Sequence, residues 1–205
     1  KKMAHPMRHV RGTRDVPLIL SANGSHILKW WVDASSAVHP NSRGHAGGGL
    51  SFGRGFPVVS STKQKLNARS SAESELVGAD DFMPQMCWTR HFMEGQGCMI
   101  EDNVSCQDNK KSSILLEKNG KASSSKRTQH INIRCFFVTC RISKNELSIK
   151  WCPTGNMIGD HATKPLQGPA FKKFRDCVVG VTPMPAEEPG SEKSKSNGDK
   201  TRRPK

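Results

Sequence analysis

The chain has 205 residues, a net charge of +14 and a hydrophobic fraction of 34%. This length allows one domain with a proper core, and the low hydrophobic fraction predicts that part of the chain is a tail. No apolar run is long enough to cross a bilayer, so no membrane partner is expected. Residues 26–180 carry 21 Lys or Arg against 13 Asp or Glu, and this basic balance favours an anionic polymer as partner.

The cysteines indicate a protein of a reducing, intracellular compartment. There are seven, an odd number, without C-x-x-C spacing or a secretory signal. His130, Cys135 and Cys140 suggest a zinc site as an alternative, but their five-residue spacing spreads them around a helix and no fourth ligand is near. Free, buried thiols are therefore the favoured interpretation.

The predicted elements begin with three antiparallel strands and continue as strands alternating with helices. In chain order they are strands 26–33, 48–55 and 56–62, a helix over 71–94, strand 103–108, a short helix, a helix over 127–143, strand 146–152 and short helices within 156–179. This order predicts an α/β fold with a five-stranded mixed sheet, three strands antiparallel and two parallel, flanked by helices on both faces.

The segment RSSAESELVGADD, at the start of the long helix, holds four acidic residues. Ser70 and Glu73 have the spacing of a capping box, in which the glutamate reaches back to the serine N–H. At 100° per residue Glu75 lies on the apolar side, whereas Glu73, Asp80 and Asp81 lie away from it and are expected to be solvated. A carboxylate that faces the core is costly unless it is paired or bound to a metal, so Glu75 is the candidate functional residue.

Three further acids stand where strands end or a helix begins. Asp33 and Asp108 each end an apolar strand, and Asp160 comes early in a helix that follows the last strand. An aspartate at a strand end is usually a turn or cap residue, so each alone is weak evidence. Convergence with Glu75 would make a site for Mg²⁺, which prefers carboxylate oxygens and works in pairs of ions on phosphodiesters.

Four segments, in this order, carry a family resemblance: KWWVDASSA, VSSTKQKLNARSSAESELVGA, CQDNKKSSILLEKNGKASSSKRTQHINIRCFFV and LSIKWCPTGNMIGDHATKPL. Over about residues 8–180 the chain closely resembles the ribonuclease H region of copia-type LTR retrotransposon Pol polyproteins. The resemblance implies the ribonuclease H fold and cleavage of the RNA strand of RNA–DNA hybrids with two Mg²⁺ ions, for which Mn²⁺ can substitute. Carried over by motif, the catalytic and metal-binding acids are Asp33, Glu75, Asp108 and Asp160.

The resemblance also implies a context for the chain. Residues 1–25 are expected to be the end of a reverse transcriptase connection, residues 26–180 the ribonuclease H-like domain and residues 181–205 a disordered basic tail. The reverse transcriptase of the same polyprotein is the expected partner, and the cytoplasm, within a virus-like particle and with nuclear entry, the expected location. The loop PTGNMIG departs from cellular ribonucleases H because it holds no histidine.

Two basic segments are candidates for contacts with nucleic-acid phosphates. They contain Lys63, Lys65, Asn67, Arg69 and Ser70 before the long helix, and Lys118, Lys121, Lys126 and Arg127 further on. The alternative for these segments is a solvated basic loop. The alternative for the whole chain is a catalytically inactive nucleic-acid-binding remnant of a decayed element, whereas an integrase is disfavoured by the Asp, Glu, Asp, Asp order.

Overall fold

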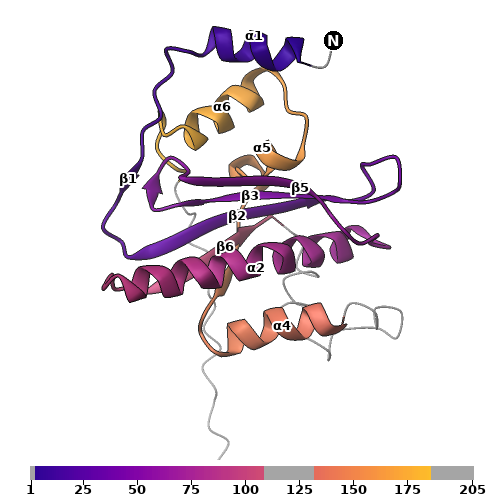
Figure 1. The fold of residues 1–205 in the computed structure, drawn as a ribbon, viewed down its shortest axis with the longest axis vertical. Coiled ribbons are helices and arrows are strands. Elements are labelled where there is room, and N and C mark those ends of the chain that lie inside the picture. Colours follow the sequence, from indigo (N-terminus) through magenta and orange to yellow (C-terminus); the bar gives the residue numbers. More distant parts are fainter. Residues whose placement is uncertain (1–2, 109–131, 186–205) are drawn as a thin grey trace, which may run out of the picture.

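The structure, a computed structural model, describes residues 3–108 and 132–185 (Figure 1). The elements in chain order are α1 (Ala4–Gly12), β1 (Ser21–Ala22), β2 (Ile27–Ser35), β3 (His45–Ser51), β4 (Gly53–Arg54), β5 (Val58–Lys63), α2 (Ser71–Gly95), β6 (Asp102–Gln107), α4 (Asn132–Ser143), β7 (Ser148–Trp151), a 3₁₀ turn (Thr154–Asn156), α5 (Asp160–Thr163) and α6 (Gly168–Val178). The predicted short helix after Asp108 and the first residues of the predicted helix 127–143 lie outside the described residues.

The central sheet has five strands in the order β5-β3-β2-β6-β7. The pairs β5–β3 and β3–β2 are antiparallel, and the pairs β2–β6 and β6–β7 are parallel. Helices α2 and α4 cover one face, and α5 and α6 cover the other, with α1 beyond α6 (Figure 1). The predicted α/β fold, a mixed sheet of three antiparallel and two parallel strands flanked by helices, is therefore confirmed.

The predicted strand 48–55 is divided in two. It begins earlier, at His45, and ends at Ser51, and the separate β4 pairs with β1 in a small second sheet. Gly53 has a φ of +149°, a conformation that suits glycine and interrupts the extended chain. The break falls at Phe52, and Gly53 is the first residue of β4.

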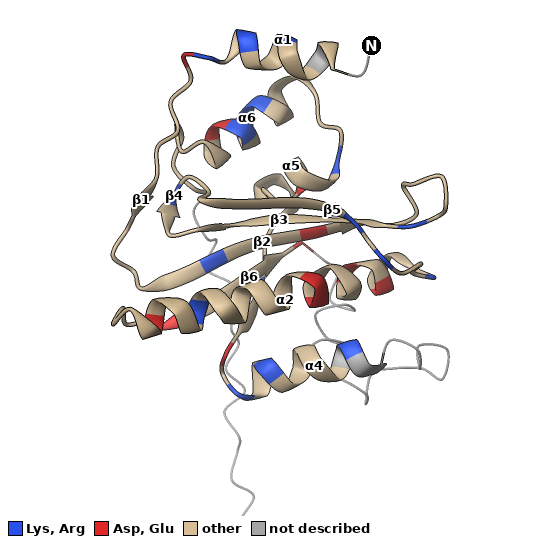
Figure 2. Cartoon of the chain, viewed as in Figure 1, with Lys and Arg blue, Asp and Glu red and all other residues tan. Residues whose placement is uncertain are grey.

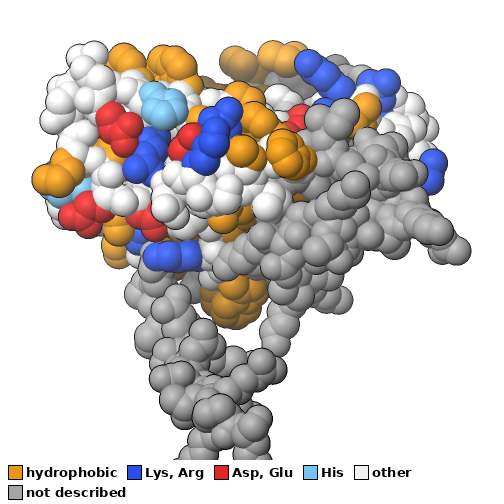
Figure 3. Space-filling model, turned by 90° about the horizontal axis from the view of Figure 1, so that it is seen from below, with side chains coloured by type: hydrophobic (Ala, Val, Ile, Leu, Met, Phe, Trp, Pro, Cys, Tyr) orange, Lys and Arg blue, Asp and Glu red, His pale blue; other side chains and the backbone are white. Residues whose placement is uncertain are grey.

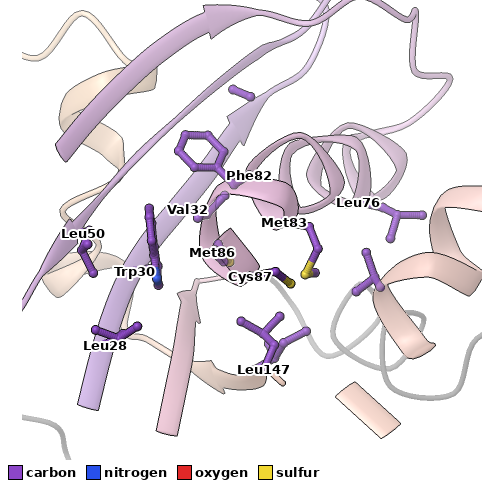
Figure 4. Close-up of a cluster of buried hydrophobic side chains, with 13 residues drawn as sticks. Leu28, Trp30, Val32, Leu50, Leu76, Phe82, Met83, Met86, Cys87 and Leu147 are labelled. Carbon is purple, nitrogen blue, oxygen red and sulfur yellow. The ribbon is translucent and has the colours of Figure 1, made fainter. Parts of the chain in front are cut away.

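Two hydrophobic clusters fill the two sides of the sheet. Leu28, Trp30 and Val32 of β2 point toward α2 and α4, where they meet Leu76, Phe82, Met83 and Met86 (Figure 4). Trp31 belongs to the second cluster, with Phe174 and Cys177 of α6. Because successive strand residues face opposite sides, burial of both faces explains why β2 reads as an almost continuous apolar run.

Two acids of α2 that were expected to be solvated, Glu73 and Asp80, are buried or half-buried. Glu73 is buried, with 5% of its surface exposed, because its Oε2 folds back and accepts a hydrogen bond from the backbone N–H of Arg69 at 2.7 Å. The Ser70 hydroxyl in turn accepts from Glu73 N–H at 3.2 Å, so the predicted cap of the first turn forms, with Arg69 N–H as a donor to Glu73. Asp80 is half-buried and pairs with Arg134 of α4, so the expectation of solvation was wrong there too.

The ends of the described chain pack on the α6 side. Ile19 N–H donates to Val179 O at 2.8 Å, and the ring of His9 in α1 meets that of Phe171 in α6 at 5.4 Å between centroids. Thr182 N–H donates to Asp176 O at 3.1 Å, while residues 186–205 lie outside the described part. The division at residues 25 and 181 stays a prediction. No described helix combines the length and apolarity needed to cross a membrane.

The cysteines with described side chains are free thiols. Four of these six are buried, one is half-buried and Cys98 is exposed. This agrees with the expectation of free thiols for these residues. His130, from the zinc alternative, lies outside the described residues, so that grouping is not tested.

Candidate metal centre

Strands β2 and β6 bring two aspartates to the same edge of the sheet. The strands are parallel, and Trp31 pairs with Cys106. Continuing this register by two residues sets Asp33 opposite Asp108, because the carboxyl ends of parallel strands meet at one edge. Two residues separated by 75 positions in the sequence thus become neighbours through strand pairing alone.

The third aspartate reaches this edge on α5, which packs closely against the sheet. A Cβ atom added to Gly47 of β3 would lie 2.7 Å from Cβ of Ala162, and one added to Gly159 would lie 3.1 Å from Cβ of Asp33. Both distances are shorter than ordinary carbon contacts, so the absence of side chains at these two glycines permits the approach. Asp160, the first residue of α5, is buried next to Asp33 as a result.

Asp33, Asp108 and Asp160 form one group in which a carboxylate oxygen of each lies within 4.8 Å of the others. Within residues 3–108 and 132–185 this is the one group of three or more side chains with the donors and spacing to hold a metal ion. Asp33 and Asp160 are buried, and Asp108 is half-buried. The structure thus brings together three of the four acids predicted from the sequence.

Glu75 comes to the end of β2 from the other face of the sheet. Its Oε2 accepts a hydrogen bond from the backbone N–H of Ala34 at 3.0 Å, one residue beyond Asp33. It is buried as predicted, but its carboxylate is not a member of the three-aspartate group. The reason is the alternation along β2: Asp33 points toward α5, whereas α2 lies on the opposite face.

Two residues that the sequence did not single out lie beside the aspartates. The Thr163 hydroxyl donates to Oδ2 of Asp33. Lys164 Nζ lies 2.5 Å from Oδ1 of Asp160 and 3.7 Å from Oδ2 of Asp33. Thr163 and Lys164 follow Asp160 at i+3 and i+4, a spacing that puts them on its side of a helical turn. This spacing is the feature of the sequence that could have identified Thr163 and Lys164 as neighbours of Asp160.

The three aspartates carry like charges at short distances, and this raises the pKa values of two of them. Burial, together with the charges of Asp33 and Asp108, raises the pKa of Asp160 to about 6 although the hydrogen bond and charge of Lys164 lower it. Burial and the charge of Asp33 also raise the pKa of Asp108. Burial lowers the pKa of Lys164, but the hydrogen bond and charge of Asp160 outweigh it and the net shift is upward. A cation is therefore favoured among these carboxylates.

The donor set fits a divalent cation. Hard ions such as Mg²⁺ and Mn²⁺ take carboxylate oxygens, and three carboxylates within ligand reach of one another supply them without nitrogen or sulfur donors. The Lys164 ammonium lies near two of these oxygens and compensates part of their charge. The carboxylate donor set, and not this ammonium, supports divalent-metal use at this edge of the sheet.

One of the two predicted basic segments lies in the described part of the chain. Lys63, Lys65, Asn67, Arg69 and Ser70 are all exposed, on the connection from β5 to α2. In Figure 2 the blue residues of this connection lie at the same end of the sheet as the red residues of β2 and of the first half of α2. Lys118, Lys121, Lys126 and Arg127 lie outside the described residues, so their predicted role is not tested.

The side of the molecule seen in Figure 3 has a different character. Lys and Arg side chains are mixed there with Asp, Glu and hydrophobic side chains wherever grey atoms do not cover the surface. No continuous basic surface is visible among the described residues of this view.

Comparison with known proteins gives both sequence matches and structural neighbours. The chain is 27% identical over 173 residues, 84% of its length, to the retrovirus-related Pol polyprotein from transposon TNT 1-94 of Nicotiana tabacum. It spans only 13% of that relative's length. No protein-family model matches.

The structural neighbours are distant in sequence. LC11-RNase H1, isolated from compost by a metagenomic approach, has a TM-score of 0.47 and 10% identity, over 72% of this chain and 97% of that one. RNase H1 from the halophilic archaeon Halobacterium salinarum has a TM-score of 0.39 and 13% identity, over 67% of this chain and 93% of that one. The sequence match confirms the resemblance to a retrotransposon Pol polyprotein, and the order and direction of the five strands agree with the ribonuclease H-like fold that this resemblance implied.

Proposed function

We propose that this region is an endoribonuclease of a copia-type element that cuts the RNA strand of RNA–DNA hybrids during reverse transcription, using two divalent ions. The observation that carries the proposal is the convergence of Asp33, Asp108 and Asp160, from two strands and a helix, within 4.8 Å of one another. Divalent ions bound there supply the activation of a water molecule and the stabilisation of the leaving oxygen.

The residues of this chain divide the work. Asp33, Asp108 and Asp160 would hold the ions, and Glu75, whose carboxylate accepts from Ala34 N–H beside Asp33, would be the fourth acid from α2. The Thr163 hydroxyl orients Asp33 through its hydrogen bond to Oδ2. The exposed connection that contains Lys63, Lys65 and Arg69 holds hybrid phosphates at the same end of the sheet, where the first turn of α2 also presents N–H groups.

A second candidate function is an inactive nucleic-acid-binding remnant. The contact of Lys164 with both Asp160 and Asp33 favours it, because an ammonium group already compensates the charge that a metal ion would neutralise. Under this alternative the basic connection still binds a hybrid, but no ion enters the carboxylate group. The two candidates therefore differ in metal binding and in cleavage, and agree in hybrid binding.

A cleavage assay separates them. The purified chain is incubated with an RNA–DNA hybrid labelled on each strand, with Mg²⁺, with Mn²⁺ or with a chelator, and a DNA duplex is the control substrate. The proposal expects products from the RNA strand alone, and only with metal. Binding of the hybrid without cleavage in either metal would establish the inactive remnant instead.

A further inference from the structure

A buried amide ties the basic connection to the first turn of α2. Gln64 follows β5 directly and is 1% exposed, although both neighbours, Lys63 and Lys65, are exposed. Its Nε2 donates to Ser74 O at 2.7 Å, and its Oε1 accepts from the Ser74 hydroxyl at 3.0 Å. One side chain thus bonds both the backbone and the side chain of one helical residue. This Gln64–Ser74 clasp fixes the distance and the rotation between the two segments.

The surrounding backbone encloses the Gln64 side-chain amide on several sides. Gln64 N–H donates to Gly44 O at 2.9 Å, which ties it to the start of β3 as well. A Cβ atom on Gly44 would lie 2.2 Å from Oε1 of Gln64 and 2.7 Å from the Ser74 hydroxyl oxygen. Ser74 is itself fully buried and its N–H donates to Ser70 O. The amide is therefore enclosed in a space that glycine at position 44 keeps open.

The clasp acts next to a proposed metal-site acid. Ser74 immediately precedes Glu75, whose carboxylate accepts from Ala34 N–H beside Asp33. Glu75 lies on the opposite face of the sheet from α5, so its approach to the aspartates depends on where the first turn of α2 is held. The Glu75 side chain bonds the end of β2, and Gln64 connects the same turn to β5 and β3.

We infer that Gln64 is a positioning residue of the metal site: through Ser74 it sets the place of Glu75 relative to Asp33. The effect on metal binding rests on the proposed function, whereas the Gln64–Ser74 clasp itself does not. Partners of metal ligands that act through hydrogen bonds typically change metal affinity by about 10–100-fold when they are removed. Loss of the clasp should therefore weaken metal binding, at the low end of that range because one residue intervenes.

The chain offers a matched control at the other end of the sheet. Asn103 of β6 is fully buried, and its Nδ2 donates to Met86 O in the middle of α2 at 3.2 Å. Its Oδ1 accepts from the Trp30 indole N–H at 3.0 Å. Gln64 and Asn103 are thus two buried amides bound to carbonyls of the same helix, and only the first lies beside Glu75.

The experiment compares Gln64→Leu and Asn103→Leu in the full chain. Hydrogen exchange without metal should become several-fold faster over residues 71–78 in Gln64→Leu, and around Met86 in Asn103→Leu. The Mn²⁺ concentration that gives half of the thermal stabilisation should rise about 10-fold in Gln64→Leu and stay within about two-fold of wild type in Asn103→Leu. The double variant Gln64→Leu, Ser74→Ala removes the unpaired hydroxyl and should fold if Gln64→Leu does not, with the same weakening of metal binding.

Two results would overturn the inference. One is an unchanged Mn²⁺ midpoint in the Gln64 variants, and the other is faster exchange in Gln64→Leu that spreads along the whole of α2 and is not confined to residues 71–78. If wild type shows no Mn²⁺ effect at all, the metal site of the proposed function fails together with the role of Gln64 in it. Faster exchange confined to residues 71–78 would then show that the clasp holds the first turn of α2 although no metal binds beside it.

Discussion

The two ends of strand β6 carry aspartates in opposite circumstances. Asp102, at the start, accepts hydrogen bonds from Asn103 N–H at 2.8 Å and from the Ser148 hydroxyl at 2.9 Å. Asp108, just past the other end, faces Asp33 and Asp160, and burial beside these like charges raises its pKa. One carboxylate is surrounded by donors, and the other shares its space with further acceptors.

The difference separates a structural acid from a functional one. A chain that had only to fold would not gather three carboxylates, because their repulsion and desolvation destabilise the charged form. Such an arrangement is common where a bound ligand or a reaction requires it. The three aspartates therefore destabilise the folded chain at one end of β6. At the other end, the Asp102 carboxylate is stabilised by hydrogen-bond donors.

The largest expected effect is on cleavage, and it contrasts the two aspartates directly. Asp108→Asn should abolish metal-dependent cleavage of the RNA strand, because the amide keeps the size but loses the charge that holds the ion. Asp102→Asn should retain cleavage within a few-fold, since the amide oxygen can still accept from Ser148. Product formation from a labelled hybrid measures both. Equal losses in the two variants would contradict the distinction between the two ends.

Hybrid affinity should change next most, at the basic connection. Replacing Lys63, Lys65 and Arg69 by Gln should weaken binding to any hybrid sequence and reduce the log–log salt slope by up to about 0.9 for each phosphate that the variant no longer neutralises. Asp108→Asn is the control here, because it removes a metal ligand and should leave affinity without metal within a few-fold. An unchanged salt slope in the triple variant would show that the phosphates are held elsewhere.

A smaller effect is expected for the cap of α2. Glu73→Ala removes the acceptor of Arg69 N–H and should lower the free energy of unfolding by about 1 kcal/mol. Cleavage should persist, since Glu73 is not in the carboxylate group. Urea denaturation and the cleavage assay on one preparation test this. Loss of cleavage in a folded variant would mean that Glu73, and not Glu75 alone, serves the site.

The smallest effect is a pH dependence of stability without metal. The pKa of Asp160 is about 6 in the folded chain and near 4 in an unfolded one. Between about pH 4 and 6 the folded chain holds a proton that the unfolded chain has lost, so this residue makes stability fall as the pH rises through that window. The melting temperature of Asp160→Asn should lack this contribution.

The comparison with Asp160→Asn cancels the contributions of the titrating histidines. Burial lowers the pKa values of His45 and His161, so these groups raise stability as the pH rises toward 6.5. They are present in both proteins, and the difference between the two melting curves therefore reports Asp160 together with the carboxyl groups that titrate with it. Parallel curves across pH 4 to 6 would contradict the raised pKa.

Local patterns in the sequence were sufficient for α2, for the approximate places of the five strands of the central sheet and for the candidate acids, but they did not predict α1 or β1. The alternation of apolar residues indicated the strands, the Ser70 and Glu73 spacing indicated the start of α2, and the apolar side of that helix singled out Glu75. These features depend on residues within a few positions of one another. The sheet of three antiparallel and two parallel strands also followed, because the order of hairpins and alternating helices restricts the possible connections.

Only the tertiary structure decided how these parts meet. It divided the predicted strand 48–55 at Phe52, buried Glu73 and paired Asp80 with Arg134, which lies 54 positions away. It also gathered Asp33, Asp108 and Asp160 while leaving Glu75 on the Ala34 N–H. The physical reason is that strand register and helix docking are set by packing between distant segments, and small residues such as Gly47 determine how closely they approach.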